Sequence, residues 1–151
     1  MTGSTKELAA PDIVLERDYL KAMYFEVDDR QPFERDPALP YDAQYNIVVD
    51  LLGRVLESTP RDLEIATQMV DPGLFEVCLT HHASSFCVED GKDYAEYNSQ
   101  LVYAGLFRVA GEMDSAMEQR CATFLVPHMK RAVDKFIDLS GSPKRFSWRF
   151  L

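Results

Sequence analysis

Cysteine is scarce in this sequence, and the cysteines that it has are not arranged in pairs. The chain of 151 residues contains Cys78, Cys87 and Cys121, an odd number without any Cys-x-x-Cys spacing. Disulfide frameworks and zinc clusters both depend on paired cysteines. The pattern excludes both, and we expect a protein of a reducing compartment.

Long hydrophobic runs are also missing. The longest nearly apolar segment, residues 101–110, contains Arg108 and is about half as long as a membrane-spanning helix. The first ten residues are polar where a signal peptide has a continuous apolar stretch. We therefore expect no export signal and no membrane anchor in this chain.

Positive charge is in short supply. Sixteen Lys and Arg stand against twenty-five Asp and Glu, which gives a net charge of -9, and a field of that sign repels nucleic acid. Hydrophobic residues at 46% are too many for a disordered chain. The composition predicts one soluble folded domain over residues 11–151, after a flexible N-terminus over residues 1–10.

The sequence motifs of common enzymes are absent too. We find no GxGxxG, Walker, HExxH or GxSxG pattern. His81 and His82 are adjacent, and on a helix they point about 100° apart, so they do not chelate a metal as i, i+4 pairs do. We expect no catalytic residue, no metal site and no cofactor.

Alternation of apolar and polar residues, the mark of a strand, is not sustained anywhere, and apolar residues recur at helical spacing instead. Residues 101–107 leave no polar face over two turns, which predicts a central buried helix over 94–110. Prolines and charges in residues 28–40 indicate a long loop, and Asp90–Gly91 indicates a turn. Thr59 is predicted to cap the helix that starts at Pro60, and Ser115 with Glu118 to cap a later one. The sequence thus predicts an all-α domain of seven or eight helices, with helical ranges 13–27, 41–57, 60–70, 74–86, 94–110, 115–139 and 143–150.

The order of these elements resembles that of the Bcl-2 family. Residues 90–96 have the spacing of the family's Asp-Gly-x-Asn-Trp-Gly-Arg motif, and residues 136–143 echo its Trp-Ile-x-x-x-Gly-Gly-Trp motif. The resemblance covers residues 13–151 and implies a Bcl-2-like helical bundle around a central apolar helix. A BH3-like row of apolar anchors is formed by Tyr45, Val49, Leu52 and Leu56.

Divergent motifs and the lack of the family's hydrophobic tail make the chain similar to the Bcl-2 homologues of large DNA viruses. Tyr94 replaces the motif's Trp, and Glu96 stands where the family has the Arg that pairs with a BH3 ligand's Asp. Glu96 also reads as a helix N3 residue that caps Asp93, and both interpretations stay open.

The resemblance implies an inhibitor of apoptosis that sequesters the BH3 helix of a pro-apoptotic, Bim-like or Bak/Bax-like protein. Its location would be the host cell cytoplasm or the mitochondrial surface, and an unfilled groove would favour a homodimer. Alternatives are a Bcl-2-fold viral inhibitor of innate immune signalling that binds an adaptor, a plain helical subunit and, last, an enzyme. The expected groove residues are Phe75, Val77, Cys78, Leu79, Tyr94, Ala95, Glu96 and Val102, whereas Leu106 and Phe107 are expected in the core.

Overall fold

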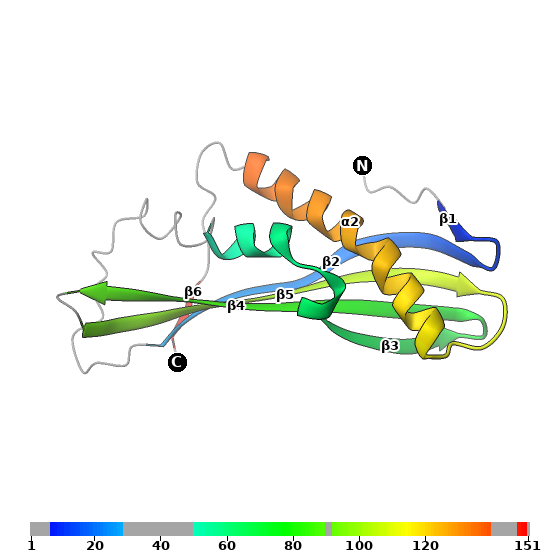
Figure 1. Cartoon of the computed structure of the whole chain (residues 1–151), viewed down its shortest axis with the longest axis horizontal. Helices are drawn as coiled ribbons and strands as arrows, with labels where there is room; N and C mark the ends of the chain where they lie inside the picture. Colours follow the sequence, from blue (N-terminus) through cyan, green and yellow to red (C-terminus); the bar gives the residue numbers. More distant parts are fainter. Residues whose placement is uncertain (1–6, 29–49, 90–91, 140–147, 151) are drawn as a thin grey trace.

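A computed structural model of the chain describes residues 7–28, 50–89, 92–139 and 148–150, and its main feature is an antiparallel β-sheet (Figure 1). The strands lie in the order β1-β2-β5-β4-β3, and a short β6 pairs in parallel with β2. Residues 50–57 are helical, and a 3-10 turn, η1 (Pro60–Asp62), follows them. The other elements are β1 (Glu7–Ala10), β2 (Ile13–Asp28), β3 (Glu64–Asp71), β4 (Leu74–Glu89), β5 (Lys92–Val109), α2 (Ser115–Leu139) and β6 (Trp148–Phe150).

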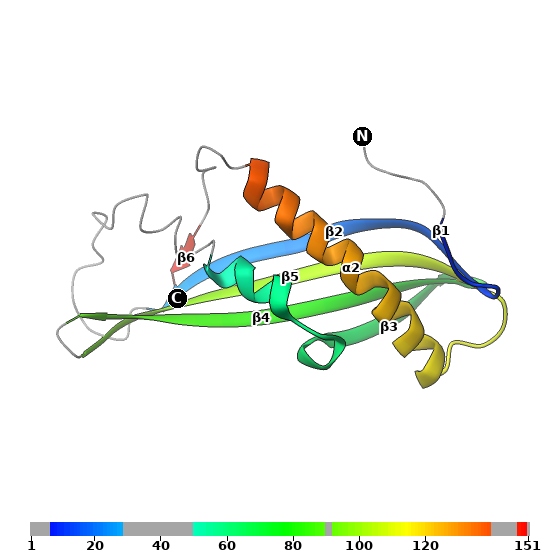
Figure 2. The same ribbon diagram turned by 45° about the horizontal axis from the view of Figure 1, so that its top comes forward.

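The helices form a second layer on one face of the sheet. Figure 2 shows α2 running obliquely across the strands, with helical residues 50–57 beside it. Alternate residues of β4 and β5 point to that layer, as the period of a β-strand requires, and most of those described are buried. The buried core includes Leu15, Leu52, Val55, Val77, Leu79, Leu101, Phe107, Leu125 and Met129.

The all-α prediction and the Bcl-2 resemblance are therefore wrong. The predicted central helix, residues 94–110, is strand β5, which lies between β2 and β4. Its side chains alternate, with Phe107 buried under α2 and Leu106 half-buried on the opposite face. A strand that is largely covered on both faces reads as a continuous apolar run, and periodicity alone does not separate such a run from a buried helix.

The predicted helix over residues 13–27 is strand β2, and its apparent helical spacing has a physical cause. Two β-bulges, between Leu15 and Arg17 and between Leu20 and Ala22, shift the pairing of β2 with β5. Each bulge inserts an extra residue and reverses which face the following side chains occupy. The apolar residues of β2 therefore lose the regular period of two.

Other local predictions are correct only in part. The predicted cap at Thr59 is confirmed, because Thr59 and Asp62 form a capping box, but the helix ends at Asp62 and residues 64–71 form β3. The helix predicted over 74–86 is strand β4. The helix predicted over 115–139 is confirmed as α2. Its cap is Asp114 and not the predicted Ser115, because the side chain of Asp114 accepts a hydrogen bond from the backbone N–H of Met117 at 2.8 Å.

Several predictions fall on residues outside the described ranges. These are the loop over 28–40 except Asp28, most of the helix over 41–57, the Asp90–Gly91 turn and the start of the last helix. Within the described N-terminal part, residues 7–10 form strand β1.

The lack of a side chain at Gly105 allows α2 to approach β5 closely. A Cβ atom at this position would lie 2.9 Å from Leu125 Cδ1, 2.9 Å from Phe107 Cε2 and 3.1 Å from Leu15 Cδ1. These three side chains are fully buried and tightly surrounded, so they have little room to move.

We expect Gly105→Ala to lower the free energy of unfolding by about 1–3 kcal/mol, as overpacking does in other cores. Gly53→Ala is the matched control, because a Cβ there meets nothing within 4 Å and an alanine favours the helix by up to about 1 kcal/mol. Urea unfolding of both variants tests this. Equal stability of the two would contradict close packing at Gly105.

His81 is a titratable side chain enclosed between the sheet and the helical layer. It is 6% exposed, and no polar atom of the described residues lies within hydrogen-bond distance of its Nδ1. Burial lowers the pKa of His81 below its usual 6.5; Asp62 opposes this shift, and His82 and Arg54 add to it. The folded protein therefore disfavours the charged imidazole.

Because the unfolded chain binds this proton more readily, the free energy of unfolding should fall as the pH drops through 6.5. One such group contributes at most about 1.4 kcal/mol per pH unit. We expect His81→Phe to reduce the loss of stability between about pH 7.5 and about pH 5.5, measured by urea unfolding. Equal slopes in the wild type and in His81→Phe would contradict the assignment to His81.

Candidate functional site

A polar cluster lies on the sheet face that carries no helix. Tyr19 and Lys21 of β2 reach across β5 to Glu76 and Cys78 of β4. The Tyr19 hydroxyl donates to Glu76, Lys21 Nζ donates to Glu76 Oε1 at 2.6 Å, and the Cys78 thiol lies 3.4 Å from the same oxygen. Ala104, in register with Tyr19 and Cys78, is fully buried beneath this cluster.

The pKa shifts of the cluster favour a structural role over a catalytic one. Burial and the hydrogen bond to Glu76 raise the pKa of Tyr19 to about 12. The hydrogen bonds from Lys21 and Tyr19 lower the pKa of Glu76, whereas burial and the nearby Glu76 carboxylate raise the pKa of the Cys78 thiol. A nucleophilic cysteine needs a lowered pKa, so this thiol stays protonated and the cluster joins β2 to β4.

Neither a metal-binding cluster nor a membrane-spanning helix occurs in the described ranges. There, no group of three or more His, Cys, Asp or Glu side chains is placed to hold a metal ion. No helix in the same ranges has the length and apolar character needed to cross a membrane. His81 faces the helical layer and His82 the opposite side of β4, where it lies 3.6 Å from Glu64.

The edge strand β3 is the part of the sheet best suited to bind another chain. It is the last strand of the sheet, so every second residue directs its backbone N–H and C=O groups away from β4. Residues 65–70 carry no charge. Met69 and Val70 are 62% and 47% exposed, although most apolar side chains of the described sheet are covered.

The opposite edge of the sheet is partly covered. Strand β1 pairs with the first residues of β2, and β6 pairs with residues 25–27. The two bulges of β2 lie between these segments and break the regular row of backbone groups. Short covering strands and bulges are common means of preventing further pairing at an edge, and β3 has only one bulge, at its end.

A cavity of about 300 Å³ lies beside β3, between this strand and the start of α2. The Thr67 hydroxyl donates to Glu118 Oε2 at 2.6 Å and so links the strand to the helix across this space. The cavity has an apolar part and two carboxylates, and no basic side chain of the described residues lines it. The lining residues are Thr67, Met69, Phe75, Met113, Asp114, Ser115 and Glu118.

The groove residues expected from the sequence are dispersed over the sheet. Phe75 lines the cavity beside β3, and Val77 and Leu79 are buried under the helices. Cys78 and Val102 belong to the opposite face of the sheet, by the alternation of their strands. Tyr94, Ala95 and Glu96 lie in β5, and their side chains are outside the described set.

Sequence reasoning missed the cavity residues other than Phe75. A signal was present, because Ile65, Thr67 and Met69 alternate with Ala66, Gln68 and Val70, and alternate members face the helical layer. The helix prediction that starts from the cap at Thr59 was continued to Val70, and this short alternation was therefore not recognised as a strand. The acidic part of the cavity needs the start of α2 beside β3, which is a long-range contact.

Comparison with known protein families finds no family model that matches this chain, and no curated protein matches it either.

Proposed function

We propose that this protein binds other polypeptides and accepts an extended segment as an additional strand at the free edge of β3. The observation that carries the proposal is an edge strand whose residues 65–70 are uncharged and partly apolar, beside a cavity, on a sheet whose other edge is partly covered and interrupted by two bulges. Addition of a strand uses hydrogen bonds between backbones, which any sequence can make except at proline. The ligands would thus share an extended conformation more than a motif.

The cavity supports a preference among side chains. A strand paired with β3 directs every second side chain toward the helical layer, where the cavity lies next to Thr67 and Met69. Met69, Met113 and Phe75 suit the aliphatic part of a long side chain, and Asp114 and Glu118 suit a positive end. We infer that Lys or Arg is favoured at that position.

The net charge of the whole chain also favours ligands that contain Lys or Arg. A net charge of -9 attracts basic segments and speeds their encounter with the protein. We expect backbone pairing with one filled cavity to give a Kd of about micromolar, or about -8 kcal/mol, which allows reversible binding.

The BH3-binding function and its adaptor-binding alternative were both implied by a Bcl-2 fold. The sheet replaces the helical bundle that would form a BH3 groove, so that reason for them is lost. Binding of either partner stays a prediction from the sequence alone.

We expect peptides of about ten residues, with apolar residues alternating with polar ones and one central Lys, to bind with a Kd of about micromolar. Replacing the central Lys by Glu should weaken binding about tenfold, because the cavity is acidic. Fluorescence anisotropy gives the affinities, and hydrogen exchange should show new protection of β3 amides.

Met69→Lys places a charge on the edge and in the cavity, and should weaken binding of the Lys peptide about tenfold or more. Leu8→Lys is the matched control, because Leu8 is 68% exposed in β1, at the other side of the sheet. Glu118→Gln should reduce the difference between the Lys and Glu peptides. Equal loss of binding in the Leu8 and Met69 variants, or protection on β2 without β3, would refute the proposed site.

A further inference from the structure

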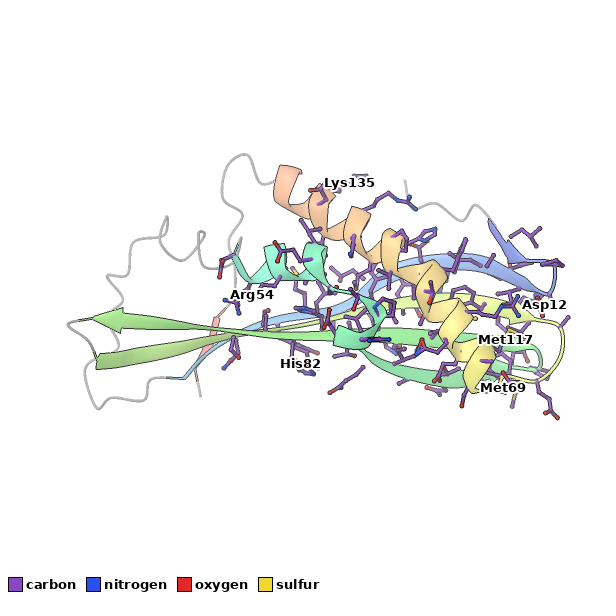
Figure 3. All side chains as sticks on the ribbon, viewed as in Figure 1. Asp12, Arg54, Met69, His82, Met117 and Lys135 are labelled. Atoms are coloured by element: carbon purple, nitrogen blue, oxygen red, sulfur yellow. The ribbon has the colours of Figure 1, made fainter. Side chains whose placement is uncertain are left out.

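Methionine is concentrated around the proposed peptide site. Met69 and Met113 line the cavity, and Met117 lies in the first turn of α2, so three of the six methionines in the chain are found here. Figure 3 shows Met69 and Met117 at the same end of the molecule, where α2 starts. Met69 is 62% exposed, and Met113 and Met117 are partly buried.

The chemistry of the thioether suits such a surface and also makes it vulnerable. A methionine side chain is flexible and polarizable, so it adapts to ligand side chains of different shape. Oxidation to the sulfoxide makes it polar and chiral, and it then packs poorly against apolar groups. In this cavity the neighbouring apolar side chain is Phe75, whose contact with a ligand or a methionine would be disturbed.

We propose that Met69 and Met113 form an oxidation-sensitive site that regulates peptide binding, an inference that rests on the proposed function. Hydrogen peroxide is the oxidant. The sulfur lone pair attacks one peroxide oxygen, the O–O bond breaks, and the departing hydroxide takes the proton of the transferred oxygen and leaves as water. The sulfur loses two electrons to become the sulfoxide. Methionine sulfoxide reductase restores the thioether with two electrons from thiols, which become a disulfide, and the oxygen leaves as water.

The fold provides a built-in comparison for this reaction. Met129 belongs to α2 and is fully buried between this helix and the sheet, so peroxide reaches it only when the protein opens. Met23 belongs to β2, distant in the sheet from β3, and is partly buried against the core. Oxidation follows exposure, so Met69 should react first and Met129 last.

The test treats the full-length protein with hydrogen peroxide, locates sulfoxides by peptide mass spectrometry and measures binding of the Lys peptide by anisotropy. We expect oxidation of Met69 to be at least about tenfold faster than that of Met129, and the affinity to fall about tenfold and to recover with the reductase. The ratio of affinities before and after peroxide is determined for each variant. It should be close to one for the double variant Met69→Leu, Met113→Leu, and as large in Met23→Leu as in the wild type.

Each outcome is informative. Equal oxidation of Met69 and Met129, unchanged affinity despite oxidised Met69, or an equal loss of affinity in the double variant would overturn the inference. Failure of the untreated protein to bind the peptide would refute the proposed function instead, and the order of oxidation would then still test the exposure of the methionine site. A circular dichroism spectrum before and after peroxide separates loss of binding from loss of fold.

Discussion

The packing of α2 against β5 is the contact on which the rest of the structure depends. β5 lies between β2 and β4, and Gly105 leaves the space into which Leu125 and Phe107 fit. The ring of Phe124 meets Phe107 edge to face, with 6.5 Å between the ring centroids. Because the helix covers these central residues, the sheet can bury one face without a second sheet.

The lengths of the two layers explain where the candidate site arises. The 18 residues of β5 extend about 60 Å at 3.3 Å per residue, whereas the 25 residues of α2 extend about 38 Å at 1.5 Å per residue. The helix also crosses the strands obliquely (Figure 2). It therefore cannot cover every strand, and the exposed side chains at the end of β3 lie where this cover stops.

The two faces of the sheet are shielded from solvent in different ways. The face under α2 is apolar and buried, and its one orphaned imidazole nitrogen among the described residues, on His81, links stability to pH. On the open face, long polar side chains cover small ones, as Tyr19 and Lys21 do above Ala104. This cover makes the open face less suited to a partner chain than the edge of β3.

The interactions that could be predicted from the sequence are local ones. The capping box at Thr59 and Asp62 and the start of α2 involve residues three or four apart, so their signals survive in any tertiary context. The candidate site depends on contacts between distant residues, such as Thr67 with Glu118, and only its acidic attraction for basic partners was implicit in the net charge.

By itself the sequence determined that the chain is acidic, that it can bury a core, that residues 59–62 form a capped turn and that residues 115–139 form a helix. Only the tertiary structure decided that residues 13–27, 74–86 and 94–110 are strands. Bulges in β2 interrupt the alternation of apolar and polar residues that identifies a strand. Both faces of β5 are covered, so its sequence has no regular row of polar residues. An apolar run is buried equally well in a helix or in a central strand, and the choice depends on which distant segments pack against it.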